Sequence, residues 1–183
     1  MPEETPFRPS VFTIGHSTRS IEAFIALLCE AGIDLLVDVR SIPGSRRNPQ
    51  FGAEALRASL AACGIAYRHM PELGGRRRGR AGEAPSPNGL WQNAAFRAYA
   101  DYALTQPFRA GLAQLLVLAR AQSCAIMCAE AVWWRCHRRI IADYLIAGGA
   151  PVFHIMGPGK IIPATLTPAA RAAGGGQLIY ALA

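Results

Sequence analysis

The chain has 183 residues, of which 51% are hydrophobic and 17% are charged. This composition excludes a disordered chain and a coiled coil. The length favours a single domain over residues 1–183, with enough apolar side chains to bury a core. Lys and Arg number 19 against 12 Asp and Glu, a formal net charge of +7. We therefore expect an anionic partner, either a small molecule or a nucleic-acid component.

No apolar run is long enough for a membrane span. The longest, at residues 112–119, is far shorter than the ~20 residues that a spanning helix needs, and Gln114 interrupts it. The N-terminal ten residues are acidic and contain proline, unlike an export signal. Five cysteines, an odd number, predict reduced thiols. We expect a cytoplasmic protein with no membrane partner, and the sequence indicates neither a cofactor nor an oligomeric state.

The predicted elements alternate between strands and helices. In chain order they are a strand at 11–15, a helix from Ser20 to Gly32, a strand at 34–39, a helix at 52–63, a strand at 65–70, helices at 94–104 and 107–121, a strand at 124–128, a helix that Gly148 ends, and a strand at 151–155. A last strand is expected within 177–182. This order predicts an α/β fold with a mainly parallel sheet of about five strands and helices on both faces, a Rossmann-like layering.

One segment has no periodicity. Residues 72–93 form a polar insertion rich in Arg and Gly. Long irregular segments in compact domains are usually functional or mobile. We expect residues 76–90 to be among the least ordered of the chain and to close over the site as a lid.

Polar residues follow three of the predicted strands. Because parallel strands end at one edge of a sheet, where ligands of such folds bind, we expect these residues to share a cleft. The first strand is followed by His16 and Ser17, the second by Asp38, Arg40, Ser45, Arg46 and Arg47, the fourth by Cys128 and Glu130, and the next helix begins near Cys136, His137 and Arg138.

The leading hypothesis is an enzyme or binding protein that acts on a phosphate-bearing small molecule, a nucleotide or a nucleic-acid component. The proposed ligand-binding residues are Ser17, Arg40, Ser45, Arg46 and Arg138. The candidate catalytic residues are Asp38 and Glu130 as acid or base, His16 and His137 as alternative proton carriers, and Cys136. We expect Glu130 to be partly buried and paired with Arg40 or Arg138.

Other interpretations stay open. His16 and Asp38 also fit structural roles, and the charged residues together fit a stabilising network. Cys128 and Cys136 allow thiol chemistry of a rhodanese-like kind, although the loop between them lacks the small residues that expose backbone amides. A third alternative is a non-catalytic nucleic-acid-binding module with Trp91 and Tyr99 as stacking surfaces. The cysteine and histidine spacing matches no strong zinc signature, so we predict no metal.

Six sequence blocks resemble the bacterial domain of unknown function 488 family: TIGHSTRSIEAFIALL, LLVDVRSIPGSRRNPQF, GIAYRHMPELGGRR, WQNAAFRAYADYALTQPF, IMCAEAVWWRCHRRIIADYL and VFHIMGPGK. The resemblance spans nearly the whole chain and implies a cytosolic α/β domain, without supplying a reaction. The family's recurrent polar positions fall on His16, Ser17, Asp38, Arg40, Pro43, Ser45, Cys128, Glu130, Cys136, His137 and Arg138. Relatives commonly carry a histidine where this chain has Ala164.

Overall fold

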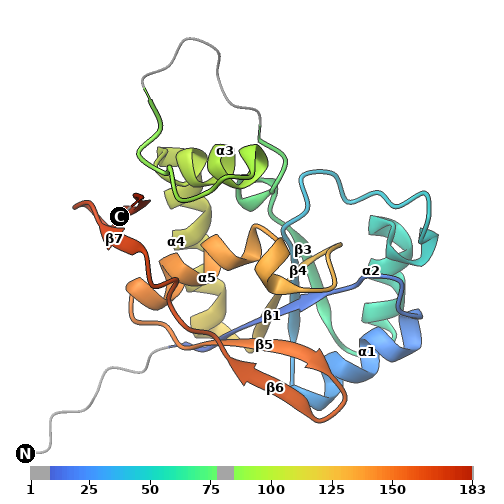
Figure 1. The fold of residues 1–183 in the computed structure, drawn as a ribbon. Coiled ribbons are helices and arrows are strands. Elements are labelled where there is room, and N and C mark those ends of the chain that lie inside the picture. The colour runs from blue at the N-terminus through green and yellow to red at the C-terminus, as the bar shows by residue number, and fades with distance from the viewer. Residues whose placement is uncertain (1–8, 78–84, 183) are drawn as a thin grey trace, which may run out of the picture.

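Figure 1 shows a computed structural model of the chain, which describes residues 9–77 and 85–182. Its main sheet has six strands in the order β3-β2-β4-β1-β5-β6. They are β1 (Val11–Gly15), β2 (Leu35–Asp38), β3 (Ala66–His69), β4 (Cys124–Cys128), β5 (Val152–Gly157) and β6 (Lys160–Pro163). All neighbours pair in parallel except β5 and β6. The expected mainly parallel α/β fold is confirmed, and β6 is a strand that the sequence did not predict.

The helices follow the predicted positions closely. They are α1 (Ile21–Glu30), α2 (Ala53–Ala61), α3 (Ala94–Ala103), α4 (Gln106–Ala121) and α5 (Arg138–Ala147). Short 3₁₀ turns occur at η1 (Pro49–Phe51), η2 (Pro71–Leu73) and η3 (Trp133–Arg135). The predicted cap of α1 is present, because the Ser20 hydroxyl accepts a hydrogen bond from the Ala23 amide at 3.2 Å. None of the helices in the described ranges is both long and apolar enough to cross a bilayer.

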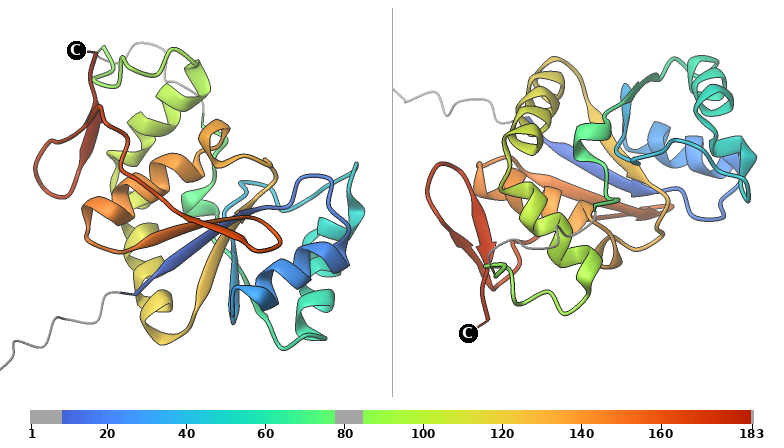
Figure 2. Two further views of the ribbon diagram at one scale, coloured as in Figure 1. Left: turned by 60° about the horizontal axis from the view of Figure 1, so that its bottom comes forward. Right: turned by 90° about the horizontal axis from the view of Figure 1, so that it is seen from above.

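Apolar side chains alternate between the two faces of the buried strands. In β4, Ala125 and Met127 pack with residues of α1 and α2, whereas Cys124 and Ile126 pack with residues of α4 and α5. Figures 1 and 2 show these helices in two layers with the sheet between them. Burial on both faces explains why the parallel strands are continuous apolar runs in the sequence.

The C-terminal segment forms a separate antiparallel pair, β7 (Ala170–Ala172) and β8 (Leu178–Tyr180). Figure 2 shows this pair beside α3 rather than at an edge of the main sheet. Its anchors are side chains of α5: the Tyr144 hydroxyl donates to the Leu178 carbonyl, and Asp143 accepts from the Tyr180 hydroxyl at 3.0 Å. The predicted last strand thus exists, but it pairs with β7.

The described parts of the insertion are packed against the protein. Arg77 lies over the Tyr102 ring, 3.6 Å from its centroid, and the Asn88 side chain accepts a hydrogen bond from the Tyr180 amide. Residues 78–84, the centre of the predicted lid, lie outside the described residues. Trp91 and Tyr99 are buried in the core, so the expectation that they offer stacking surfaces to nucleic acid is wrong.

Candidate functional site

A cleft lies at the carboxyl ends of β1, β2 and β4. It consists of three adjoining hollows that share Glu130 as a lining residue. The central hollow, of about 220 Å³, is lined by His16, Arg40, Ser45, Arg76, Cys128 and His137 among others. The outer hollow, of about 810 Å³, reaches Ser17, Arg46 and Arg47. The thiol-side hollow, of about 220 Å³, reaches Tyr99, Cys136 and His137. Most of the predicted site residues therefore line one continuous depression.

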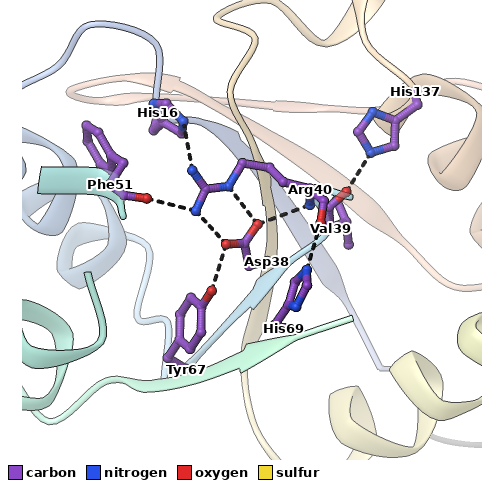
Figure 3. Close-up of polar contacts among 8 residues, drawn as sticks. All are labelled: His16, Asp38, Val39, Arg40, Phe51, Tyr67, His69 and His137. Carbon is purple, nitrogen blue, oxygen red and sulfur yellow. Dashed lines mark hydrogen bonds and ion pairs between the residues drawn. The ribbon is translucent and has the colours of Figure 1, made fainter. Parts of the chain in front are cut away.

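Arg40 is held at the floor of the cleft by an ion pair with Asp38. Asp38 Oδ1 accepts from Arg40 Nε at 2.9 Å, and Oδ2 accepts from Nη2 at 2.6 Å (Figure 3). Arg40 Nη2 also donates to the Phe51 carbonyl, and the Tyr67 hydroxyl donates to Asp38 Oδ2 at 2.8 Å. Burial disfavours the charge on Arg40, but the hydrogen bond and charge of Asp38 outweigh it and raise the Arg40 pKa.

Asp38 therefore positions another residue instead of facing the cleft. Its side chain is fully buried, and it does not line any of the three hollows. Both of its oxygens accept hydrogen bonds, from Arg40 and from Tyr67. A carboxylate so engaged fixes the direction of the guanidinium, a role that the sequence analysis left open as an alternative to acid–base chemistry.

His16 presents one ring nitrogen to Arg40. Its Nδ1 donates a hydrogen bond to the Ser17 carbonyl at 2.8 Å. Nε2 is therefore unprotonated and accepts a hydrogen bond from Arg40 Nη1, with 3.4 Å between the two nitrogens. The ring is stacked on Phe51, with centroids 4.2 Å apart. Burial lowers the His16 pKa; the Ser17 carbonyl opposes this effect, and the charge of Arg40 adds to it. The imidazole is thus a neutral base with a defined tautomer.

The chain bends sharply after β1, and this bend brings the Ser17 carbonyl to His16 Nδ1. Ser17 has φ of 49°, the only non-glycine residue with positive φ in the described ranges. Its amide donates to the Ala129 carbonyl at 3.0 Å, which holds the bend in place. Residues in this left-handed region cost about 1–3 kcal/mol and are concentrated at functional sites. Here the unusual conformation turns the Ser17 carbonyl toward the ring of His16.

His137 lies on the other side of the cleft. Its Nε2 donates to the Val39 carbonyl at 2.9 Å, and its Nδ1 lies 3.4 Å from the Cys136 sulfur (Figure 3 shows the Val39 contact). The Tyr99 ring packs edge-on against it. His137 directly precedes α5, so its position is set by the start of that helix and by the end of β2 together.

The structure corrects the expectation for Glu130. Its side chain is exposed, and its carboxylate has no partner among the described residues. Arg138 instead donates to the backbone carbonyl of Glu130 at 2.8 Å. The β4 strand is buried, but the chain emerges into solvent directly after Cys128, which explains why the carboxylate is not paired. Glu130 is consequently a free negative charge in an otherwise cationic cleft.

The remaining predicted ligand residues lie at the rim. Arg46 and Arg47 are exposed and line the outer hollow. The Ser45 hydroxyl accepts a hydrogen bond from the Asn48 amide at 3.1 Å, which shapes the loop that carries the two arginines. Arg76 is a rim residue that the sequence analysis did not assign to the site, and it lines both the central and the outer hollow.

Cys128 and Cys136 form a buried pair with Arg138. Their sulfur atoms lie 2.8 Å apart, and Arg138 Nε donates to Cys128 Sγ at 2.9 Å. Arg138 is 2% exposed, so it lies behind the cleft and does not reach a ligand in it. The expectation that Arg138 binds the ligand directly has no support in this geometry.

Several residues of the site were not predicted from the sequence. Tyr67 and Phe51 hold Asp38 and Arg40, and Thr13 joins Arg138 to His154. Thr13 is a hydroxyl within an otherwise apolar buried strand, and such a polar position is a signal for a buried partner. The contacts of Tyr67 and Phe51 depend on the order of strands in the sheet, which local patterns do not contain.

The family's sequence model, described as Domain of unknown function DUF488, matches residues 20–145. The chain belongs to this family. The DUF488 match covers β2, β4 and most of α5, with Arg40, Glu130, Cys136 and His137, whereas His16 and Ser17 precede it. Comparison with curated proteins and with solved structures gives no match.

Two further expectations concern metals and Ala164. Within residues 9–77 and 85–182, no cluster of three or more His, Cys, Asp or Glu side chains could hold a metal ion. Ala164, where the family resemblance led us to expect a histidine, packs against the core beside β5 and does not line the cleft. Residue 164 therefore contributes nothing to the lining of the three hollows.

Proposed function

We propose that the cleft binds a phosphate-bearing small molecule and that His16 accepts a proton from it, with Arg40 as the anion ligand. The observation that carries this proposal is the contact between Arg40 Nη1 and His16 Nε2 at the floor of the central hollow. It places a fixed cation and a neutral base side by side. This combination suits a reaction in which an anionic substrate loses a proton.

The hydrogen-bond inventory of Arg40 leaves one donor for a ligand. A guanidinium has five N–H groups. Nε and the two N–H groups of Nη2 are used by Asp38 and Phe51, and one N–H of Nη1 is used by His16. The remaining N–H of Nη1 is available at the wall of the central hollow. A phosphate oxygen there would gain a charge-assisted hydrogen bond from the arginine. Transfer of a proton to His16 Nε2 then requires Arg40 Nη1 to release that nitrogen and to turn its second N–H to the ligand as well.

The rim supplies more positive charge than negative charge. Arg46, Arg47 and Arg76 line the cleft, and Glu130 is its only carboxylate among the described residues. The outer hollow, at about 810 Å³, is within the size range of small-molecule sites. It gives room for the remainder of a nucleotide-sized ligand, whereas the central hollow suits a single phosphate group. Glu130, with its free carboxylate, is the second candidate proton carrier.

Calorimetric titration tests the binding step. Inorganic phosphate, pyrophosphate, AMP and ATP are the ligands, and adenosine is the phosphate-free control. We expect binding of at least one phosphate compound, no binding of adenosine, and weaker binding in the Arg76→Ala and Arg46→Ala/Arg47→Ala variants. Arg120→Ala is the matched control, because Arg120 is an exposed arginine of α4 that does not line the cleft. Equal losses in the control, or no binding at all, would refute the proposal.

Proton linkage tests the role of His16. A bound anion favours the imidazolium, so binding near pH 6 should be accompanied by proton uptake, which titrations in buffers of different ionisation enthalpy measure. His16→Phe keeps an aromatic ring against Phe51 and removes both nitrogens. We expect this variant to bind phosphate without that proton uptake. Unchanged uptake in the variant would exclude His16 as the proton acceptor.

A further inference from the structure

We propose that Cys128 and Cys136 are a redox-active pair, which a hydroperoxide converts reversibly into a disulfide, with Cys136 as the attacking thiolate. The pair adjoins the Arg40–His16 floor of the cleft, since Cys128 lines the same central hollow, but its chemistry does not require the phosphate ligand. It therefore adds a second chemistry at the same strand ends. The inference depends on the geometry of the two sulfurs, on the charges around them and on the hollows that reach them.

The two sulfur atoms are already in contact. Cys128 ends β4 and Cys136 lies just before α5, and their Sγ atoms are 2.8 Å apart. A disulfide bond measures about 2.05 Å, so small side-chain rotations are enough to close it. Eight positions separate the two residues in the chain, and the η3 turn brings them together. No large backbone movement is needed for the oxidation.

The surrounding charges favour a thiolate. Arg138 is almost completely buried, and it forms no ion pair with a carboxylate among the described residues. Its Nε donates to both sulfurs, at 2.9 Å to Cys128 and 3.4 Å to Cys136. Because a buried cation needs a countercharge, we infer that the pair of sulfurs shares one proton and carries one negative charge. Arg138 is then neutralised within the protein.

We assign the negative charge mainly to Cys136, whose sulfur accepts a hydrogen bond from the Arg138 amide at 3.5 Å and lies 3.4 Å from His137 Nδ1. Burial opposes its ionisation, but the hydrogen bond from Cys128 and the charges of His137 and Arg138 hold the Cys136 pKa well below its ordinary value. Burial and the neighbouring Cys136 raise the pKa of Cys128 well above its ordinary value. The Tyr99 ring also faces this group, and burial keeps its hydroxyl neutral by raising its pKa. Cys136 is thus the nucleophile and Cys128 the resolving thiol.

Small oxidants can reach both sulfurs. Cys136 lines the thiol-side hollow, and Cys128 lines the central hollow. Each of the two residues is only 2% exposed, which excludes bulky disulfides and favours a compact hydroperoxide. The other cysteines lack this environment: Cys29 and Cys63 are exposed, and burial raises the pKa of Cys124 to about 12.

The reaction proceeds in two steps. The Cys136 thiolate attacks one oxygen of hydrogen peroxide, the O–O bond breaks, and hydroxide leaves and takes the proton of Cys128 to form water. The Cys128 thiolate then attacks the sulfur of the Cys136 sulfenic acid and expels the second hydroxide, which takes a proton from solvent. Two electrons pass from the two sulfurs to peroxide, giving one disulfide and two water molecules. A dithiol reductant reduces the disulfide back to the two thiols and is itself oxidised to a disulfide.

Oxidation has a consequence for Arg138. The disulfide carries no charge, so the buried guanidinium loses its counterion. Stabilisation of the reduced form makes a disulfide easier to reduce. We therefore expect the oxidised protein to melt at a lower temperature than the reduced protein, although cross-links generally stabilise.

The first test is peptide mapping of the oxidised protein. A Cys29→Ser/Cys63→Ser background, which removes the two exposed thiols, is treated with hydrogen peroxide, alkylated, digested and analysed by mass spectrometry. We expect a linked peptide pair containing Cys128 and Cys136 that dithiothreitol abolishes, while Cys124 stays reduced. Two alkylatable thiols at Cys128 and Cys136 after peroxide treatment of the folded protein would overturn the proposal.

Single substitutions then test the order of attack. In the same background, Cys128→Ala should accumulate a sulfenic acid at Cys136 that a dimedone probe traps, whereas Cys136→Ala should give little trapping at Cys128. The opposite pattern would overturn the assignment of Cys136 as the attacking group. Circular dichroism verifies that each variant is folded. Because the linked peptide is sought in a protein that keeps both residues, a variant that fails to fold leaves the first test decisive.

Discussion

Gly75 packs directly against the ring of His137. A Cβ atom at Gly75 would lie 2.6 Å from Cγ of His137, closer than side chains approach one another. The ring cannot retreat easily, because its Nε2 is bonded to the Val39 carbonyl and its other edge faces Cys136. Gly75 is the second glycine of the LGG block, and its lack of a side chain leaves the space that the imidazole of His137 occupies. The loop after η2 therefore fixes one wall of the cleft.

Substitution of this glycine should displace the histidine. Gly75→Ala forces the His137 ring away from Val39 or shifts the loop, and overpacking of this kind costs about 1–3 kcal/mol. We expect a lower unfolding free energy in urea and slower alkylation of Cys136, since His137 helps to stabilise its thiolate.

Gly44 provides the matched control for this change. It lines the same cleft, but a Cβ atom there would meet only Ile42, at 3.9 Å. Gly44→Ala should change the unfolding free energy by less than about 0.5 kcal/mol and leave the alkylation rate of Cys136 unchanged. Equal effects of the two substitutions would contradict the packing argument.

Asp38→Asn should be among the most destabilising substitutions in the site. It leaves the buried Arg40 without its countercharge, and removal of one partner of a buried pair costs about 3–5 kcal/mol. Tyr67→Phe removes only one hydrogen bond to the same carboxylate and should cost about 1.5 kcal/mol. Denaturant unfolding measures both. A smaller loss for Asp38→Asn than for Tyr67→Phe would disprove the view that Asp38 holds Arg40 in place.

Glu130→Gln should behave differently from Asp38→Asn. The Glu130 carboxylate is exposed and unpartnered among the described residues, so its neutralisation should change the unfolding free energy by less than about 0.5 kcal/mol. Removal of a negative charge from a cationic cleft should also strengthen binding of inorganic phosphate. A large fall in melting temperature would show that Glu130 has a structural partner after all.

Two buried histidines predict a loss of stability in acid. Burial lowers the pKa of His154 from its ordinary 6.5 to about 4, and it lowers that of His16 as well. Between pH 6.5 and 4 the unfolded chain therefore binds more protons than the native protein, and stability falls as the pH falls. Each histidine contributes at most about 1.4 kcal/mol per pH unit.

The contribution of His154 can be separated by substitution. His154→Phe keeps the stack on Trp133 and removes the titrating nitrogens. Unfolding free energies measured across the window from pH 6.5 to 4 should fall less steeply in this variant than in the wild type. The same slope in both proteins would mean that His154 is not buried as a neutral ring.

Local patterns in the sequence were sufficient for most elements of the fold. The apolar run from Cys124 to Cys128 predicted β4 because a strand covered on both faces carries no polar side chain. The β6 strand was missed because it is an exposed edge strand with Lys160 and Pro163 at its ends, so burial left no pattern in its residues. The order of the strands depends on contacts between distant segments, and no local pattern contains it.

The position of a site residue could be predicted wherever the direction of its strand in the sheet was enough to fix it. The strand-end rule placed His16, Arg40 and Glu130 at one edge, and the structure has all three lining the central hollow. The same rule did not predict which of these side chains are buried, because the burial of Arg138 and the exposure of Glu130 depend on the path of the chain after β4. Whether these residues bind and transform a ligand stays a prediction until the titrations are done.

The two edges of the sheet limit how copies of this chain can associate. The order of strands ends in β3 on one side and β6 on the other, and each has only four residues. Arg68 is an exposed charge on β3, while β6 carries Lys160 and a proline that has no amide to donate. Short, charged or proline-bearing edges resist the addition of a foreign strand. The described part of the chain is thereby protected against growth of its sheet into aggregates.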